Sequence, residues 1–315
     1  MDLSIIVVNW NSADYLKECV ASVEQNTTGI TYEFVVVDNN SAAGEIERLR
    51  DLPPSVKLIE SGENLGFAKA NNLGFRNSSG DYLLFLNPDT KLIGPSINKM
   101  LAAARALPDA GVVGCKLLNS DLSVQLSSIQ AVPNIMNQVL DAEYLLLKWP
   151  RCSLWKTAPL FSNNANPVKV DMISGACMLI KRNVFESVGM FSEDYFMYAE
   201  DLDLNCKILD AGHSNYYVGE AEIIHHGGKS SSRQKVSQWT VVMKNRAMCR
   251  FFQKRRGRFY EWMYRAAMSC AATGRLLILA MMFPYRDKEW VKDASTKWKT
   301  ILKSMMGFQV LPIEN

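Results

Sequence analysis

LSIIVVNWN, residues 3–11, is an almost continuous apolar run that ends in two asparagines around a tryptophan. A strand that is apolar on both faces has to be covered on both sides, as the strands of a parallel sheet are by their crossover helices. A helical pattern follows at Leu16, Val20 and Val23, and a parallel neighbour needs such a connection. The stretch therefore predicts the first strand and helix of an α/β sheet.

The same alternation of strand and helix continues through residues 1–115. Two further apolar runs, at 32–41 and 56–64, are followed by a helical segment at about 66–77 and by YLLFLNPDT at 82–90. Strands of this kind, separated by helices, are typical of open α/β sheets. We predict an α/β fold with a doubly wound, mostly parallel sheet and flanking helices.

The rest of the chain predicts a second half of this domain and a helical C-terminal region. Residues 116–170 are less regular, and we expect them to form a mobile or substrate-shaping excursion over the site. A strand and a helix return at 170–196. The predicted division is a domain at 1–235, with a nucleotide-binding half at 1–115 and an acceptor and catalytic half at 116–235, and a basic helical region at 236–315.

Polar residues follow three of the predicted strands at the point where each ends. They are Asn9, Trp10 and Asn11 after the first, Asp38, Asn39, Asn40 and Ser41 after the second, and Asn87, Pro88, Asp89 and Thr90 after the fourth. One such group alone is usually an ordinary turn, because Asn, Asp and Ser are favoured turn residues. The carboxyl ends of parallel strands meet at one edge of the sheet, where ligands bind. Three polar groups at one edge therefore predict a binding site.

A helix start rich in small residues, ENLGFAKANNLGF at 63–75, adds to this edge. Gly66, Ala68 and Ala70 permit close backbone approach, and amides at a helix N-terminus suit phosphate. Neither GxGxxG nor GxxxxGK[ST] occurs in the chain, so a dinucleotide site of that type and a P-loop kinase lose support.

Composition limits the class of protein. The chain is 48% hydrophobic and 21% charged, which excludes a mainly disordered protein. Its seven cysteines are scattered and form no CxxC pair, as expected in a reducing compartment without a disulfide framework or structural zinc site. The N-terminus lacks a basic region and a long apolar run, so we expect no signal peptide and a cytoplasmic protein. The apolar segment 266–282, interrupted by Arg275, is expected to fall short of a membrane span.

Positive charge is concentrated at 244–265, which holds eight basic residues and one acidic residue in a chain whose net charge is only +3. Aromatic residues are interleaved with these charges. The pattern suits an amphipathic helix on an anionic membrane surface, and a helix with a solvated basic face fits it equally well. Nucleic-acid binding is less favoured, because no recognised nucleic-acid-binding motif accompanies the basic segment.

Three acids stand within four positions in YFMYAEDLDLNCKILDAG, residues 195–212. If the segment lies on the protein surface, Asp201 begins a helix there. Helix capping then accounts for one of the three carboxylates but not for all of them. Because an unpaired buried charge is costly, we expect Glu200, Asp201 and Asp203 to face a polar cleft. In that cleft Asp201 would be the general base for a hydroxyl nucleophile, Glu200 would orient sugar hydroxyls, and Asp203 would cap or brace the helix.

A divalent metal is expected if the substrate is a nucleotide diphosphate that carries a transferable group. A cation held by oxygen ligands commonly stabilises the departing diphosphate. Asp89 at its strand end is one candidate ligand. His225 in HHGGKS is the second, with His226 as the runner-up, and a neutral imidazole suits manganese.

Seven motifs identify a family when they are read together. In chain order they are SIIVVNWN, VVVDNNS, NLGFAKANN, LFLNPD, SGACMLIKR, FMYAEDLDL and HHGGKS. With these motifs, over about residues 3–232, the chain resembles glycosyltransferase family two, and most of all its bacterial rhamnosyltransferase-like members. The QxxRW motif of the processive synthases is missing.

This resemblance implies a GT-A fold and an inverting transfer of a single sugar from a nucleotide diphosphate sugar. Asp38 would contact the base and ribose of the nucleotide, and Asp89 would contact the metal and the diphosphate. Asn87 stands where many relatives have an acidic residue. Asp201 would be the catalytic base, and His225 falls on the family's histidine. Mn²⁺ or Mg²⁺ is the implied cofactor.

The resemblance also implies a substrate-binding set and a biological setting. The residues expected to bind the nucleotide sugar are Asn9, Asn11, Asp38, Asn40, Gly66, Phe67, Asn71, Asn87, Gly175 and Ala176. dTDP-rhamnose is the favoured donor, ahead of UDP- and GDP-linked sugars. The acceptor would be a glycan or polyprenyl-linked glycan of a cell-surface polysaccharide such as the O-antigen of lipopolysaccharide, handled at the cytoplasmic face of the inner membrane.

Two other classes of protein remain open at this point. One is a non-catalytic nucleotide-sugar-binding protein, and the intact Asp201, Asp89 and His225 argue against it. The other is a nucleotidyltransferase on a similar sheet, which would usually carry a Gly-rich loop near the N-terminus. NWNSADYL is not such a loop.

Overall fold

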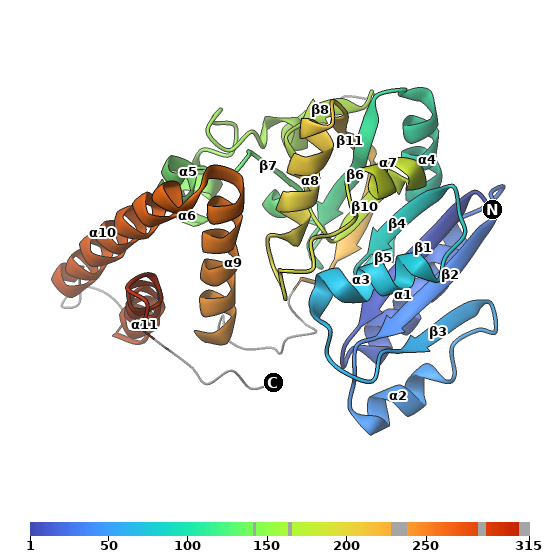
Figure 1. Ribbon diagram of the computed structural model, residues 1–315, viewed down its shortest axis with the longest axis horizontal. Coiled ribbons are helices and arrows are strands. Elements are labelled where there is room, and N and C mark those ends of the chain that lie inside the picture. The colour runs from blue at the N-terminus through green and yellow to red at the C-terminus, as the bar shows by residue number, and fades with distance from the viewer. Residues whose placement is uncertain (141–142, 163–165, 228–237, 283–287, 309–315) are drawn as a thin grey trace. The chain divides into compact units, whose positions relative to one another are not determined.

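The computed structural model describes the chain except for residues 141–142, 163–165, 228–237, 283–287 and 309–315 (Figure 1). Contacts divide it into two compact units. The α/β unit comprises Met1–Val132, Lys148–Phe196 and Glu200–Arg233, and the helical unit comprises Pro133–Leu147, Met197–Ala199 and Gln234–Asn315. The domain boundary predicted between residues 235 and 236 lies outside the described residues.

Four parallel strands make one half of the main sheet, in the order β3-β2-β1-β4. They are β1 (Leu3–Asn9), β2 (Tyr32–Asp38), β3 (Val56–Glu60) and β4 (Tyr82–Leu86). Asn9 is the register partner of Asp38, so the polar ends of β1 and β2 lie side by side. This arrangement was predicted from the apolar runs, and the α/β fold class is confirmed.

The other half of the sheet continues in the order β10-β6-β11-β5, with β8 paired to β11. β10 runs antiparallel to β4 and β6, whereas β6 and β11 are parallel. A separate two-stranded sheet joins β7 to β9. The bounds are β5 (Thr90–Leu92), β6 (Ala110–Leu118), β7 (Ile129–Gln130), β8 (Val168–Val170), β9 (Met172–Ile173), β10 (Cys177–Lys181) and β11 (Ser214–His225).

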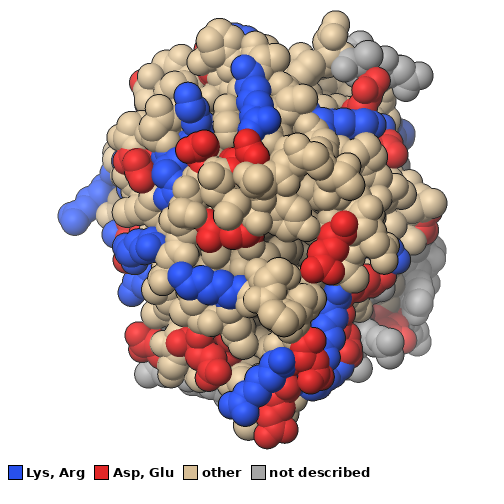
Figure 2. Space-filling view, turned by 90° about the vertical axis from the view of Figure 1, so that its right-hand side faces the viewer, with Lys and Arg blue, Asp and Glu red and all other residues tan. Residues whose placement is uncertain are grey.

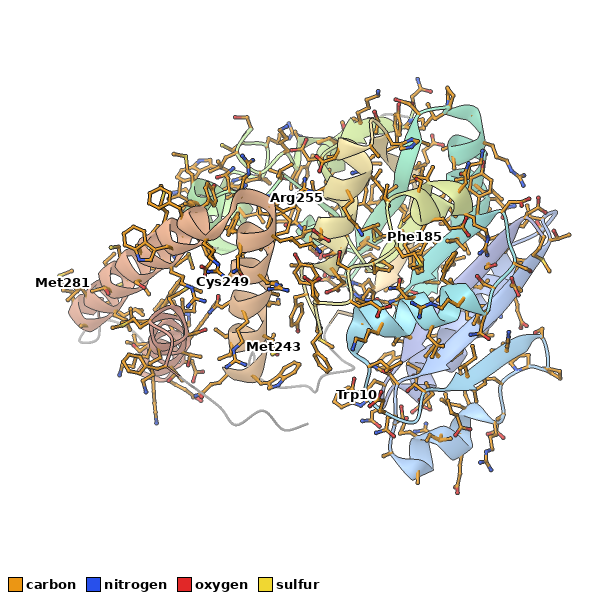
Figure 3. All side chains as sticks on the ribbon, viewed as in Figure 1. Trp10, Phe185, Met243, Cys249, Arg255 and Met281 are labelled. Atoms are coloured by element: carbon orange, nitrogen blue, oxygen red, sulfur yellow. The ribbon has the colours of Figure 1, made fainter. Side chains whose placement is uncertain are left out.

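Helices cover both faces of the sheet and form two cores. Neighbouring residues of β1 point to opposite sides, so Ile5 belongs to one core and Ile6 to the other. α1 and α4 contribute to the first core, and α3, α7 and α8 to the second, in which Phe185 packs on Phe85 (Figure 3). The bounds are α1 (Ala13–Asn26), α2 (Ala43–Leu49), α3 (Gly66–Arg76), α4 (Ser96–Ala106), α7 (Arg182–Ser187) and α8 (Glu200–Asp210).

The middle segment is more regular than predicted. β6 extends to Leu118, and two 3₁₀ turns, η1 (Leu126–Ser128) and η2 (Ala158–Phe161), follow in the α/β unit. α5 (Ile135–Leu140) and most of α6 (Glu143–Lys148) lie in the helical unit. The excursion is therefore shared between the two units.

The helical unit is built around α9 (Gln238–Arg256), α10 (Arg258–Met282) and α11 (Lys288–Met305), with α10 packed against both others. Gly257 has a φ of +86° and ends α9 before α10 begins. The prediction of one amphipathic helix at 244–265 is therefore wrong, since the segment spans parts of two helices. The apolar residues 266–282 continue α10 without a break.

Charge differs between the two units. On the face shown in Figure 2 basic and acidic side chains are interspersed. Surface ion pairs in the α/β unit include Lys17–Asp51 and Arg76–Glu193. Such exposed pairs contribute little to stability individually. Residues 238–308, by contrast, hold fifteen basic and four acidic side chains, a net charge of +11.

Candidate active site

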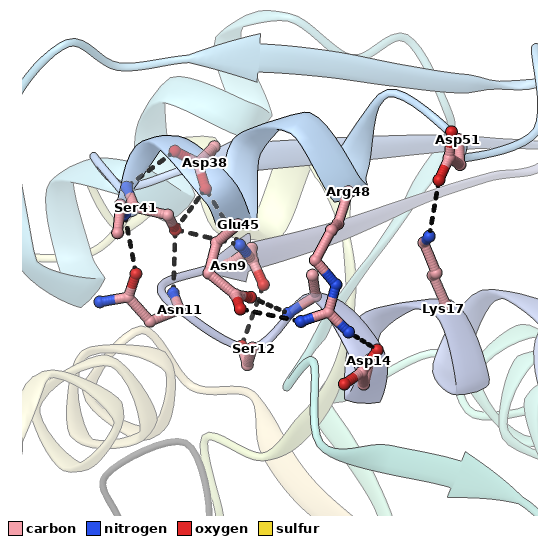
Figure 4. Close-up of polar contacts among 12 residues, drawn as sticks. Asn9, Asn11, Ser12, Asp14, Lys17, Asp38, Ser41, Glu45, Arg48 and Asp51 are labelled. Atoms are coloured by element: carbon pink, nitrogen blue, oxygen red, sulfur yellow. Dashed lines mark hydrogen bonds and ion pairs between the residues drawn. The ribbon is translucent and has the colours of Figure 1, made fainter.

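The ends of β1 and β2 are tied together by the carboxylate of Asp38 (Figure 4). Its Oδ1 accepts hydrogen bonds from Asn9 Nδ2 at 3.0 Å and Ser41 Oγ at 2.6 Å, and its Oδ2 accepts one from the Ser41 amide at 2.9 Å. Asp38 is only 1% exposed. A carboxylate has about four acceptor positions, so these three hydrogen bonds leave one of them unused. Asn9 and Ser41 therefore hold Asp38 in place.

Asn11 completes this network from the loop after β1. Its amide donates to Ser41 Oγ at 2.9 Å, and its Oδ1 accepts from the Ala42 amide at 2.8 Å. Asn11 and Asn40 have φ values of +50° and +64°, a left-handed conformation that asparagine tolerates better than most residues. Asn40 is exposed, and Trp10 is 42% exposed at the same edge (Figure 3).

The start of α2 braces α1 below these loops. Glu45 accepts a hydrogen bond from the Ala13 amide at 3.0 Å and another from Arg48 at 2.9 Å (Figure 4). Arg48 also pairs with Asp14. The loops that carry Asn11 and Asn40 therefore lead into helices that are held together by charged side chains.

Gly66 lets α3 approach the segment that leads to the acidic motif. Its φ is +74°, and a Cβ at this position would lie 2.2 Å from the carbonyl oxygen of Phe196. The Phe67 amide donates to that same oxygen at 2.8 Å. The NLGFAKANN motif thus positions the residues just before the acids, which explains why a glycine stands there.

The amides at the start of α3 are engaged within the protein. The Leu65 amide donates to Asn39 Oδ1 at 2.8 Å, and the Gly66 amide donates to Asn64 Oδ1 at 3.1 Å. Asn71 is buried and donates to the Phe67 carbonyl at 2.9 Å. These observations give Gly66, Phe67 and Asn71 positioning contacts. They provide no free amide for phosphate at Leu65, Gly66 or Phe67.

Asp89 and His225 come together although 136 residues separate them in the sequence. β5 pairs antiparallel with β11, which makes His225 the partner of Thr90 and brings it beside Asp89. Asp89 Oδ1 lies 3.3 Å from His225 Nε2, and Asn87 Nδ2 lies 3.3 Å from the same nitrogen. His225 is the last residue of β11. Residues 228–230 of the HHGGKS motif lie outside the described residues.

Gln125 fixes the tautomer of His225, and sequence reasoning missed it. Gln125 Nε2 donates to Asn119 Oδ1 at 3.1 Å, so its Oε1 is the atom that faces His225 Nδ1 at 2.8 Å. The proton of a neutral imidazole then lies on Nδ1, and its unprotonated Nε2 faces both the side-chain amide of Asn87, which can donate to it, and the carboxylate of Asp89. A carboxylate oxygen and a nitrogen lone pair at 3.3 Å repel each other unless a proton or a cation bridges them.

His226 points to a different set of partners. Its amide donates to the Asp89 carbonyl at 2.9 Å, but its Nδ1 lies 2.8 Å from Ser120 Oγ. Its ring packs on Tyr15 with 5.5 Å between centroids, and its Nε2 is 3.9 Å from Glu18. Of the two candidate histidines, His225 is therefore the one whose imidazole faces Asp89.

Asp201 is held at the start of α8 by two backbone amides. Its Oδ2 accepts from Gly175 at 2.9 Å, and its Oδ1 accepts from Leu202 at 2.8 Å. Asn205 anchors this turn to β9, because its side chain bonds both the amide and the carbonyl of Ile173 and also the carbonyl of Asp201. Burial raises the pKa of Asp201, whereas the hydrogen bonds from Gly175 and Leu202 oppose that rise.

Glu200 is buried, and its Oε2 has no hydrogen-bond partner among the described residues. Burial and, to a smaller extent, the neighbouring charge of Asp201 raise the pKa of Glu200 to about 8. The two backbone donors favour the negative charge of the pair on Asp201, and Glu200 keeps its proton to higher pH than an ordinary glutamate. The prediction that all three acids face a cleft is wrong for Glu200 and for Asp203, which is buried and bonded to Ser192.

The residues just before α8 belong to the helical unit by their contacts. Tyr198 and Ala199 have φ values of +70° and +64°. The ammonium group of Lys244 on α9 lies 5.2 Å from the centroid of the Tyr198 ring. Two consecutive left-handed residues that are not glycine are costly and occur where function requires them.

One backbone hydrogen bond joins the loop that carries Asp89 to the segment that holds Asp201. The Asn87 amide donates to the Ala176 carbonyl at 2.9 Å, next to Gly175, which holds Asp201. The structure thus brings Asp89, His225 and Asp201 around one edge of the sheet. Gly175 and Ala176 link them through the backbone.

Known proteins are similar to this chain in sequence and in fold. Residues 4–189 match the model of a family described as Glycosyl transferase family 2. The N-acetylglucosaminyl-diphospho-decaprenol L-rhamnosyltransferase of Mycobacterium tuberculosis is 32% identical over 256 residues, 77% of this chain and 82% of the relative. A rhamnosyltransferase of Escherichia coli is 25% identical over 255 residues, 78% of this chain and 92% of the relative.

A solved mannosyltransferase from Pyrobaculum calidifontis, in complex with GDP-mannose and Mn²⁺, has a similar fold. The TM-score is 0.58 at 17% identity, with 96% of this chain and 86% of the other covered. At this level of identity the likeness concerns the fold alone. It confirms the predicted GT-A-type architecture.

Proposed function

Because the chain belongs to glycosyl transferase family 2, we propose that it transfers one rhamnosyl group from dTDP-rhamnose to a hydroxyl of a lipid-linked glycan, with inversion. Family membership makes it a glycosyltransferase of polysaccharide synthesis. Two relatives named as rhamnosyltransferases support the donor sugar. The name of the mycobacterial relative supports an acceptor linked through diphosphate to a polyprenol.

The contact path between Asp201 and the pair Asp89–His225 is the observation that carries this proposal. Asp201 takes the proton of the acceptor hydroxyl as its oxygen attacks the anomeric carbon. The bond between that carbon and the diphosphate oxygen breaks, and the electron pair leaves with the diphosphate. General-base assistance of this kind typically contributes on the order of a hundredfold to ten-thousandfold in rate.

Asp89 and His225 fit a divalent cation, Mn²⁺ or Mg²⁺. They offer one carboxylate oxygen and one imidazole nitrogen, and Gln125 Oε1 accepts a hydrogen bond from the other ring nitrogen, as is usual for the partner of a ligating histidine. Among the described residues no third His, Cys, Asp or Glu joins them, so further ligands would be oxygens of the diphosphate or water. When bound, the cation supplies positive charge against the departing diphosphate.

The nucleotide would bind at the ends of β1 and β2. The exposed ring of Trp10 is available for stacking on a base, and Asp38 keeps one acceptor position for a donor hydroxyl or imide. Two backbone amides favour the charged form of Asp201, whereas burial favours the protonated form of Glu200, so Asp201 is the member of the pair suited to accept a proton.

The test is transfer with defined donors and variants. We expect turnover with dTDP-rhamnose to exceed turnover with UDP- and GDP-linked sugars, and the product to have the inverted anomeric configuration by NMR. Asp201→Asn should remove transfer and leave nucleotide binding by calorimetry nearly unchanged. Asp210→Asn, at the exposed end of the same helix, is the matched control. Retained configuration, or more than a tenth of wild-type turnover in Asp201→Asn, would contradict the mechanism.

A further inference from the structure

One face of α10 is apolar and exposed along its whole length. Its large exposed side chains, between 40% and 73% accessible, are Phe259, Trp262, Met263, Leu277, Ile278 and Met281. Every residue from 259 to 281 that is exposed is uncharged. We call this surface the α10 outer face. It extends for about 33 Å, at roughly 1.5 Å per residue.

The charged residues of α10 after Arg258 point the other way. Glu261 and Arg265 pair with each other, one turn apart. Arg275 donates to the Val139 carbonyl of α5 at 2.8 Å, and its guanidinium lies 4.1 Å from the ring centroid of Trp298 on α11. A surface helix in water shows its charges outward and its apolar residues inward, so α10 has the reverse polarity. Water is therefore not the expected environment of the α10 outer face.

The length and composition of α10 are those of a membrane span. Its inner face, however, packs through Tyr264, Met268 and Leu279 against α9 and α11. Those two helices expose basic residues, including Lys244 and Arg246 on α9 and Lys292, Lys297, Lys299 and Lys303 on α11. Each such charge at the centre of a bilayer costs about 2.5–3.5 kcal/mol even on insertion scales. The packed helices therefore favour an orientation in the plane of the membrane.

The charge of this unit indicates which lipid surface it meets. Residues 238–308 carry +11, and Lys254, Arg256 and Arg258 stand at the end of the α10 outer face where Phe259 and Trp262 stack with 6.2 Å between ring centroids. Aromatic rings and basic side chains are enriched at the headgroup level. Each lysine or arginine near an anionic surface adds roughly 1 kcal/mol of attraction.

We propose that the α10 outer face binds an anionic lipid bilayer, with α10 lying at the level of the headgroups. The glycosyltransferase would then work at the surface where a polyprenyl-linked acceptor is embedded. Only this last step depends on the proposed function, because binding to the bilayer follows from the helical unit itself. The surface is not the single basic helix expected from the sequence but an apolar face flanked by charge.

The test is partition of the full-length protein onto vesicles of phosphatidylcholine with and without phosphatidylglycerol. Ile278→Glu should lower the partition coefficient by about tenfold or more, because roughly 1.5–3 kcal/mol of apolar burial is lost. Ile93→Glu, with an isoleucine of similar exposure (48% against 52%) in the α/β unit, is the matched control and should bind as the wild type does. Circular dichroism of both variants checks the fold.

Four outcomes would overturn the proposal. The first is equal partition of Ile278→Glu and wild type, and the second is no preference for phosphatidylglycerol. The third is resistance of the bound protein to carbonate extraction, which would indicate a membrane span. The fourth is a lipid-independent dimer that Ile278→Glu dissociates. A water-soluble acceptor separates this proposal from the proposed function. Ile278→Glu should keep wild-type turnover on that acceptor, whereas failure of the wild type there would count against the function and not against the membrane surface.

Discussion

Gly175 donates its amide to Oδ2 of Asp201 at 2.9 Å, and a Cβ at Gly175 would lie 3.1 Å from Asp201 Cβ. The glycine therefore sets the position of the Asp201 carboxylate, the proposed base. We expect Gly175→Ala to push the Asp201 carboxylate away by a few tenths of an ångström and to lower kcat by at least about tenfold, since small misplacements are costly in catalysis. Gly44→Ala, where an added Cβ meets nothing within 4 Å, is the control and should leave steady-state kinetics unchanged. Equal kcat in the two variants would show that Gly175 has no positioning role.

Glu200 should make stability depend on pH. The pKa of an unfolded glutamate is about 4.3, and that of folded Glu200 is about 8, so between these values the native state keeps a proton that the unfolded state has released. The stabilisation from protonated Glu200 is fully present below the unfolded-state pKa. Above that pKa the free energy of unfolding falls by up to about 1.4 kcal/mol per pH unit. Glu200→Gln lacks this loss, so its advantage in free energy of unfolding should grow between about pH 5 and about pH 8. Urea unfolding curves that differ by the same amount at both pH values would refute the assignment.

Gln125 should affect metal binding without touching the metal. Gln125→Leu removes the acceptor for His225 Nδ1, and loss of such a partner typically weakens metal affinity by about tenfold to a hundredfold. Gln125→Glu keeps an acceptor and should restore most of the affinity. Calorimetric titration of Mn²⁺ into the complex with a nucleoside diphosphate measures this directly. His226→Gln is the control, and a larger loss there than in Gln125→Leu would favour His226 as the ligand.

Trp10 should contribute to nucleotide affinity. Its ring is exposed at the edge where Asp38 keeps one acceptor position, and an aromatic stacking contact is worth about 0.5–1.5 kcal/mol. Trp10→Ala should therefore raise the Kd for dTDP by roughly twofold to tenfold. Trp10→Phe should raise it less. Unchanged affinity in Trp10→Ala, measured by calorimetry, would place the base elsewhere.

The parts of the site that follow strands were predictable from sequence. Asn9, Asp38 and Asp89 each end an apolar run, and parallel pairing places such ends at one edge. The role of Gln125 was not predictable, because its contact with His225 spans 100 residues of sequence and depends on the pairing of β11 with β6. The burial of Glu200 was missed for a similar reason, since adjacent acids usually indicate exposure.

The helical region shows the same limit. Basic residues at 244–265 were noticed because charge can be counted without a structure. The α10 outer face becomes readable only when the break at Gly257 is known, because residues before the break belong to α9 and do not continue the faces of α10. The proposed lipid surface consequently lies further along the chain than the charge count indicated.

β10 runs against its neighbours, with Cys177 opposite Leu86. In a sheet of parallel strands alone, only residues that follow strand ends would lie at the substrate-binding edge. Here residues that precede a strand, Gly175 and Ala176, lie at that edge as well. The hydrogen bond from the Asn87 amide to the Ala176 carbonyl joins the segment that follows β4 to the segment that precedes β10. If Asp89 faces the leaving diphosphate and Asp201 is the base, as proposed, a sugar donor that displaces the first segment would also displace the second.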